Sequence, residues 1–127
     1  MEGDWDLALI LVIEDDDQIR IILREVLEEE GYDVVEARDG REGTRIYREI
    51  SPDLVITDML MPKKDGIETI ADLQAMSPEV KIIAISGGDR LGPEPYLAIA
   101  KGFGAATVFT KPFMIRELLE AVKRALA

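Results

Sequence analysis

The chain has 127 residues, which suits one ordinary domain, and 47% of them are hydrophobic, enough for a substantial core. It has no cysteine and no histidine, which excludes disulfides, thiol chemistry and the commonest metal ligands, so any bound metal must be a hard cation that prefers oxygen. A net charge of −11 makes nucleic acid and anionic membrane surfaces poor partners.

Residues 1–6 read as a short leader, after which five short apolar runs alternate with helical patterns. Several runs are continuously apolar, which is typical of strands buried on both faces of a parallel sheet. None approaches the roughly 20 residues of a membrane helix, and no signal peptide is evident. We therefore expect one cytoplasmic domain over residues 1–127. The runs are Leu7–Ile13, Val34–Ala37, Leu54–Thr57, Lys81–Ile85 and Ala106–Thr110.

Amphipathic patterns predict the helices between these runs. Asp16 and Asp17 are expected to cap the first helix, and Gly31 to end it. Its apolar stripe comprises Ile19, Ile22, Leu23, Val26 and Leu27. A second helix is expected over Arg41–Ile50, although Gly43 weakens it, and a third over Gly66–Met76, with Asp65 as its cap. Two more are expected, one over Pro95–Lys101 and one around Ile115, Leu118, Leu119 and Val122. Five strand–helix units in succession predict an α/β fold, a parallel sheet with helices on both faces.

Polar residues stand where several of the predicted strands end. Glu14 and Asp15 follow the first strand and Asp58 ends the third, while Ser86 and Lys111 follow the fourth and fifth. Ligands of such sheets bind beyond the carboxyl ends of the strands, so we expect these side chains to gather at one edge. Each residue alone has an ordinary explanation as a helix cap, a turn or a loop. Their occurrence together at one edge favours a site.

Three carboxylates in one place repel each other unless a cation joins them. Because the chain offers oxygen ligands only, Mg²⁺ is the natural choice. A carboxylate beside Mg²⁺ and a lysine can act as a nucleophile toward phosphorus and form an aspartyl phosphate. The two positive charges would neutralise the transferring phosphoryl oxygens.

The sequence closely resembles the receiver domain of two-component response regulators, from about Ala8 to Leu126. The matching pieces are ILVIEDDDQIRIIL, EEGYDVVEARDGREG, PDLVITDMLMPKKDG, IIAISGG and TKPF. The D-x-x-M-P-x-x-D-G element at Asp58–Gly66, followed by K-P-F, is specific. The resemblance implies a flavodoxin-like doubly wound fold, with five parallel strands in the order 2-1-3-4-5 flanked by five helices.

The resemblance also implies a Mg²⁺ site. Asp58 would be the phosphoacceptor. Asp15, Asp58 and the backbone carbonyl of Leu60 would bind Mg²⁺ directly, and Glu14 would reach it through water. The domain would be a signalling module rather than an enzyme, catalysing only its own phosphorylation and dephosphorylation.

The remaining expected roles concern phosphoryl transfer and output. Lys111, with a cis bond to Pro112, would hold the phosphoryl group, and Ser86 would be the switch hydroxyl. A sensor histidine kinase, a phosphotransfer protein or a small phosphodonor would supply the group. Phosphorylation would bias the face formed by the fourth helix, fifth strand and fifth helix toward a downstream protein target or effector domain. Homodimers through this face are common in the family.

The fifth strand departs from the family pattern, and three other functions compete with the receiver assignment. Val108 occupies the position where the family usually carries a switch tyrosine or phenylalanine, and Phe109 should point to the opposite side of the strand. The main alternative is a receiver-like interaction domain that works without phosphate. A phosphatase of the haloacid dehalogenase type is disfavoured because Leu60 replaces its second acid. A dinucleotide-binding protein is disfavoured because no G-x-G-x-x-G follows the first strand.

Overall fold

A parallel β-sheet forms the centre of the molecule. The computed structural model describes residues 7–59, 66–86, 107–110 and 113–127. Its strands run in the order β2-β1-β3-β4-β5, and every neighbouring pair is parallel. The strands are β1 (Leu9–Ile13), β2 (Asp33–Ala37), β3 (Leu54–Asp58), β4 (Ile82–Ser86) and β5 (Thr107–Thr110).

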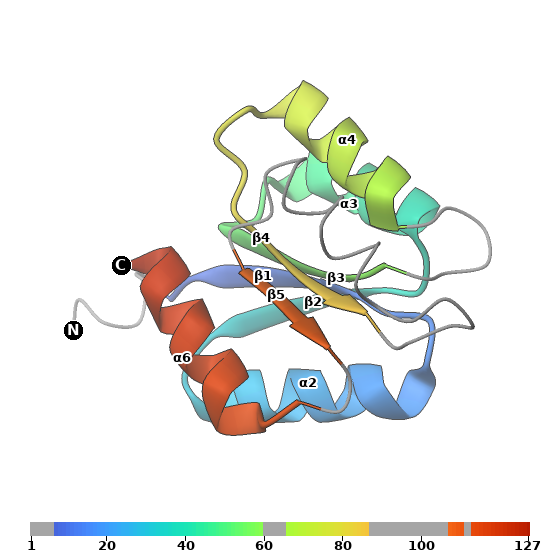
Figure 1. Ribbon diagram of the computed structural model, residues 1–127. Helices are drawn as coiled ribbons and strands as arrows, with labels where there is room; N and C mark the ends of the chain where they lie inside the picture. The colour runs from blue at the N-terminus through green and yellow to red at the C-terminus, as the bar shows by residue number, and fades with distance from the viewer. Residues whose placement is uncertain (1–6, 60–65, 87–106, 111–112) are drawn as a thin grey trace.

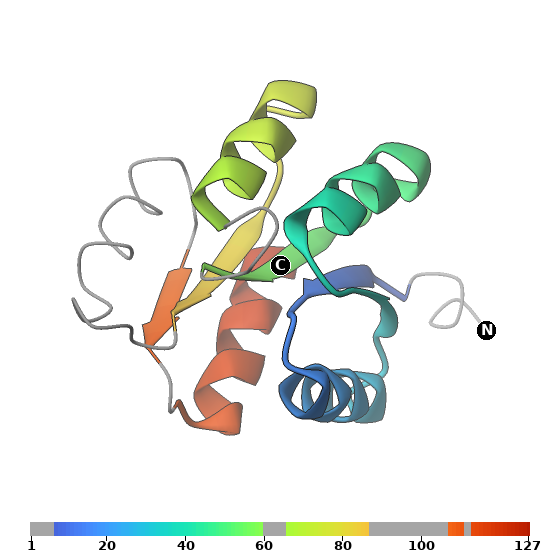
Figure 2. The ribbon, with the colours of Figure 1, turned by 90° about the vertical axis from the view of Figure 1, so that its right-hand side faces the viewer.

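Helices cover both faces of this sheet (Figures 1 and 2). α3 (Gly40–Ile50) and α4 (Gly66–Met76) lie on one face, and α2 (Asp17–Glu29) and α6 (Ile115–Leu126) lie on the other. The predicted α/β fold is therefore confirmed. The helix expected over residues 95–101, the leader and the cap at Asp65 lie outside the described residues. Among the described helices, none is both long and apolar enough to cross a membrane.

Alternate residues of the central strands enter two separate cores. Leu11, Ile13 and Val55 pack on the side of α3 and α4. Ile10 and Val12 pack on the side of α2 and α6, together with Leu118 and Val122 of α6. Burial on both faces explains why these strands read as continuous apolar runs rather than as alternating ones.

The N-terminus of α2 corrects one prediction. The cap is Asp16 alone, whose Oδ1 accepts from the backbone N–H groups of Gln18 at 2.9 Å and Ile19 at 3.0 Å. Asp17 is the first residue of the helix, and its carboxylate instead pairs with Arg20 at 2.6 Å. The cap residue needs extended backbone, and Asp16 has it, with φ −78° and ψ 115°.

The buried stripe of α2 also differs from the predicted one. Ile22 is 49% exposed, whereas Arg20, Leu23 and Leu27 are buried. The helix ends at Glu29, and Gly31, the predicted stop, follows its C-cap with a φ of +96°. The N–H of Gly31 donates to the carbonyl of Glu28, and that of Tyr32 donates to the carbonyl of Leu27, which is the Schellman arrangement.

Gly43 of α3, which weakened the helical pattern, allows α3 to approach the sheet closely. A Cβ placed on this residue would lie 2.8 Å from Cγ1 of Ile13, a fully buried side chain of β1. The lost helix propensity is therefore linked to the close packing of α3 on β1.

Candidate functional site

Three carboxylates meet at the carboxyl edge of the sheet. The last register pair of β1 and β3 is Ile13 with Thr57. The next residues, Glu14 just after β1 and Asp58 at the end of β3, therefore lie side by side. Ligand oxygens of Glu14, Asp15 and Asp58 all lie within 4.8 Å of one another. The structure thus brings together the three acids expected to form the metal site.

The three acids differ in their access to solvent. Glu14 is 1% exposed and Asp58 is 5% exposed, whereas Asp15 is exposed. Asp15 is therefore the member of the cluster with the greatest access to solvent.

The spacing of these oxygens fits a small hard cation. Two oxygens bound directly to one Mg²⁺ lie at most about 4.2 Å apart, because each Mg–O distance is about 2.1 Å. The limit of 4.8 Å on the cluster is close to this value, and one ligand acting through water removes the difference. The donor set consists of carboxylates, which a zinc or copper site would not favour over imidazole or thiolate.

Backbone contacts hold Glu14 in place. Its N–H donates to the carbonyl of Ala37 in β2 at 3.0 Å. Its carboxylate accepts from the N–H of Asp16 at 3.1 Å, and its own carbonyl accepts from Nη1 of Arg20 at 2.9 Å. Glu14 is thus tied to β2, to the turn that follows it and to α2.

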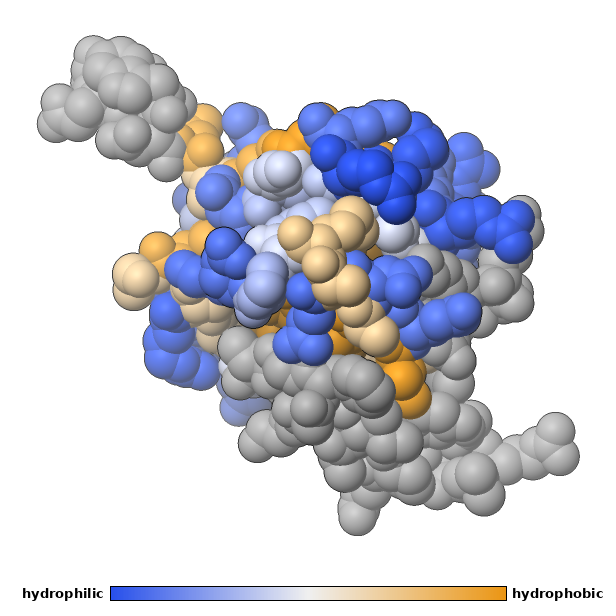
Figure 3. Space-filling model, turned by 90° about the horizontal axis from the view of Figure 1, so that it is seen from above, coloured by the Kyte–Doolittle hydropathy of each residue, from blue (hydrophilic) through white to orange (hydrophobic). Residues whose placement is uncertain are grey.

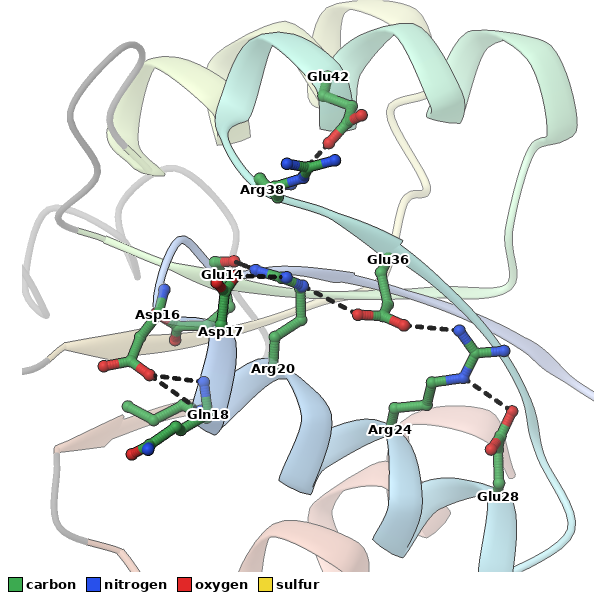
Figure 4. Close-up of polar contacts among 11 residues, drawn as sticks. Glu14, Asp16, Asp17, Gln18, Arg20, Arg24, Glu28, Glu36, Arg38 and Glu42 are labelled. Carbon is green, nitrogen blue, oxygen red and sulfur yellow. Dashed lines mark hydrogen bonds and ion pairs between the residues drawn. The ribbon is translucent and has the colours of Figure 1, made fainter.

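An ion-pair network runs from this point along α2 (Figure 4). Arg20 also donates to Asp17 at 2.6 Å and to Glu36 at 2.9 Å, and Arg24 donates to Glu36 at 2.6 Å and to Glu28 at 3.0 Å. The hydrogen bond from Arg24, together with that from Arg20, outweighs burial and lowers the pKa of the Glu36 carboxyl. Burial acts to lower the pKa of Arg20, but its bonds to Asp17 and Glu36 raise it above the ordinary value.

The switch hydroxyl and the lysine are placed only in part. Ser86 is the last residue of β4 and follows Ile85, the register partner of Asp58. Its backbone therefore lies at the same edge as the acids. Leu60, Lys111 and Pro112 lie outside the described residues, so their expected roles stay predictions.

β5 carries the position where the family usually has an aromatic switch residue. Val108 is opposite Ala84, which belongs to the core beneath α3 and α4. Phe109 packs against the other core, and its ring centroid lies 5.8 Å from that of Phe113. Phe109 therefore points to the face covered by α2 and α6, opposite to the face on which Ala84 packs, as the alternation of a strand predicts.

Gly66 shapes the backbone next to the candidate phosphoacceptor. Its N–H donates to the carbonyl of Met59 at 3.0 Å. A Cβ at this position would lie 2.5 Å from the carbonyl oxygen of Asp58 and 2.6 Å from Cα of Met59. Only a glycine allows α4 to begin this close to the end of β3, so the glycine of the motif has a steric reason here.

The ion pairs of Arg20 and Arg24 with Glu36 were not predicted from the sequence. Arg20 occupies a position of the buried stripe, three and seven residues before Leu23 and Leu27, and an arginine there is a signal that a buried charge needs partners. Glu36 interrupts an otherwise apolar strand. These two signals together would have suggested a pair between α2 and β2.

The fold and the site define a class of protein: a doubly wound α/β domain whose carboxyl edge carries a cation-competent cluster of acids. Residues 10–123 match the model of the response regulator receiver domain. The chain belongs to this family, whose members are signalling domains of two-component phosphorelays rather than classical enzymes.

Relatives and solved structures agree with this assignment. The chain is 36% identical to sporulation initiation phosphotransferase F of Bacillus subtilis over 91% of this chain and 90% of that protein. It is 32% identical to the chemotaxis protein CheY of Thermotoga maritima over 91% of this chain and 94% of that protein. A receiver domain from Clostridium thermocellum superposes with a TM-score of 0.87 at 34% identity, covering 94% of each chain.

Proposed function

We propose that this chain is a cytoplasmic receiver domain in which Asp58 accepts a phosphoryl group. The donor is a sensor histidine kinase, a phosphotransfer protein or a small phosphodonor such as acetyl phosphate. The observation that carries the proposal is the meeting of Glu14, Asp15 and Asp58 within 4.8 Å at the carboxyl edge of the sheet. A nucleophilic carboxylate needs a compensating positive charge at that place to approach an anionic phosphoryl group.

The proposed step is a simple displacement at phosphorus. An oxygen of ionised Asp58 forms the new O–P bond while the bond from phosphorus to the donor atom breaks. The electron pair of that bond leaves on the imidazole nitrogen of a phosphohistidine or on the carboxylate oxygen of acetyl phosphate. Bound Mg²⁺ supplies positive charge to the phosphoryl oxygens. The burial of Asp58, at 5% exposed, limits competing contact with water.

The proposed metal ligands are Asp15, Asp58 and the backbone carbonyl of Leu60, with Glu14 acting through water. Asp15 is the exposed member of the cluster and is therefore the first carboxylate that an arriving ion meets. Glu14 is fixed by its contacts to β2 and α2, which suits a residue that orients a water ligand.

The proposed output uses the other half of the sheet. Lys111 holds the phosphoryl group and Ser86 moves toward it, which biases the face formed by the predicted helix over 95–101, β5 and α6. This face then binds a downstream protein or effector domain, or a second copy of the chain. Val108 is a β-branched residue with no ring to rotate, so Ser86 acts here without the usual aromatic partner.

Intact-protein mass spectrometry after incubation with Mg²⁺ and acetyl phosphate tests the proposal. We expect a gain of one phosphoryl group, which chelation of Mg²⁺ prevents and Asp58→Asn abolishes. Asp33→Asn is the matched control, because Asp33 is an exposed aspartate at the start of β2, on the opposite edge of the sheet. No mass gain in the wild type would favour the phosphate-independent interaction domain instead.

A further inference from the structure

Arg20 is a buried cation that contacts the backbone of the acidic cluster at Glu14. Its side chain is 10% exposed and comes from the first turn of α2. Its three guanidinium nitrogens donate to acceptors on three different segments (Figure 4): the Glu14 carbonyl at 2.9 Å, Asp17 at 2.6 Å and Glu36 at 2.9 Å. A side chain shared among three segments fixes their relative positions.

The contact with Glu14 stands at the end of the β1–β2 ladder. The last register pair of these strands is Ile13 with Ala37, so Glu14 lies one residue beyond it. Glu14 is 1% exposed, and a buried carbonyl needs a hydrogen-bond donor. Nη1 of Arg20 is the donor here, and it fixes the peptide from which Asp15 continues.

The geometry points to a role for Arg20 in the metal site. We propose that Arg20 is a positioning residue: by holding the Glu14 carbonyl, it keeps the carboxylates of Glu14 and Asp15 in place to share one cation with Asp58. The inference rests on the proposed function, since it assumes that the cluster binds Mg²⁺. Arg20 donates to none of these three carboxylates in the hydrogen bonds described above, so it acts on the site through the backbone.

A positioning role and a purely electrostatic role predict opposite effects on Mg²⁺ affinity. A positive charge close to a cation site repels the cation, so removing that charge strengthens binding if charge is all that matters. If Arg20 positions Glu14 and Asp15, its removal weakens binding instead. The sign of the change therefore separates the two roles.

Arginine rather than lysine is required by this arrangement. A planar guanidinium carries five N–H groups in a fixed fork, which reaches three acceptors in different directions. A lysine ammonium keeps the charge but has a single nitrogen on a flexible stem. Arg20→Lys therefore removes the positioning and keeps the electrostatic repulsion.

Isothermal titration of the full chain with Mg²⁺ tests this inference, alongside urea unfolding of each variant. Arg20→Lys and Arg20→Met should each raise the Mg²⁺ dissociation constant roughly tenfold, as losses of outer-shell partners do. The matched control is Arg24→Met, which removes a second arginine from Glu36, because the described hydrogen bonds of Arg24 reach Glu36 and Glu28. It should keep the dissociation constant within about twofold of the wild type while lowering stability.

The outcomes are distinguishable. Unchanged or tighter Mg²⁺ binding by Arg20→Lys overturns the inference, and so does an equal loss of affinity in Arg24→Met. If Arg20→Met does not fold, Arg20→Lys carries the test because it retains the charge. A wild-type chain that binds no Mg²⁺ would contradict the proposed function itself, whereas normal wild-type binding with unaffected variants would contradict only the role of Arg20.

Discussion

The helices α2 and α3 lie on opposite faces of the sheet and are attached to it by different means. α2 is joined to β2 by Arg20 and Arg24, which both bind Glu36. α3 has arginine pairs too, but Arg45 reaches Glu42 and Glu49 only at 3.8 and 3.7 Å, all within α3. Figure 3 looks down on the layer of α3 and α4, and strongly hydrophilic side chains cover much of it.

The difference shows that the same residue types have different consequences according to where they point. The Arg20 side chain is 10% exposed and that of Arg45 is 56% exposed. Arg20 joins three segments at the edge that carries the acids, whereas Arg45 pairs only with residues of its own helix in the ion pairs described. α3 is held to the sheet by apolar packing, in which Tyr47 is buried in the core and Gly43 allows the close approach to Ile13. Substitutions that alter one attachment at a time separate these contributions.

The steric attachment of α3 should give the largest effect. Gly43→Val places methyl groups against buried Ile13, and we expect a loss of about 2–3 kcal/mol in the free energy of unfolding, as for an overpacked core. Urea denaturation measures it. Adding Ile13→Val, which removes the Cδ1 methyl nearest to residue 43, should recover part of the loss. Equal losses in the presence and absence of Ile13→Val would show that the contact is not the cause.

The ionic attachment of α2 should depend on pH. Glu36→Gln should cost about 1–2 kcal/mol at pH 7, less than a fully buried pair because the Glu36 side chain is 25% exposed. Since the folded pKa of Glu36 is lowered, its contribution is present above the unfolded value of about 4.5 and is lost as the pH falls through the folded pKa.

Urea denaturation of dilute protein at several pH values measures this dependence. The difference between the wild type and Glu36→Gln should shrink as the pH falls below about 4.5. A difference that is constant from pH 7 downward would show that the charge of Glu36 does not matter.

The start of α2 should show a smaller effect. Asp16→Ala removes the side chain that caps two N–H groups, with an expected loss of about 1 kcal/mol. Thermal unfolding measures the change against Asp17→Asn, which removes the charge that pairs with Arg20 but leaves the cap. The cap assignment fails if Asp16→Ala is as stable as the wild type.

The outer pairs of α3 should contribute least. Arg45→Met should change the free energy of unfolding by no more than about 0.5 kcal/mol, because its pairs are long and solvated. Measurements at low and high salt should give the same small value. A loss of stability as large as that of Glu36→Gln would contradict the proposed difference between the ion pairs of α2 and those of α3.

The fold and the acidic cluster were predictable for identifiable reasons. Continuous apolar runs identify strands buried on both faces, and the rules of parallel sheets then place Glu14, Asp15 and Asp58 at one edge. Both predictions depend on period and order along the chain, which a sequence shows directly. The glycine at 31 likewise indicated a helix end through its backbone freedom.

Other features depend on side-chain direction, which the sequence does not show. Asp16 and Asp17 are the same residue type in adjacent positions, and only the folded backbone shows that Asp16 is the cap. Ile22 fits the apolar stripe by spacing, yet the helix turns Arg20 inward and leaves Ile22 half exposed. Two of the three partners of Arg20, Glu14 and Glu36, lie 6 and 16 residues away, so these pairings exist only in the folded chain.

The proposed function requires that β1 and β3 share one cation at their carboxyl ends. Backbone amide NMR during a Mg²⁺ titration tests it most directly. We expect the signals of Glu14, Asp15, Asp58 and Met59 to shift together with one dissociation constant, and Asp15→Asn to raise that constant equally for all of them. Independent constants for the two strands, or shifts confined to the opposite edge of the sheet, would contradict it.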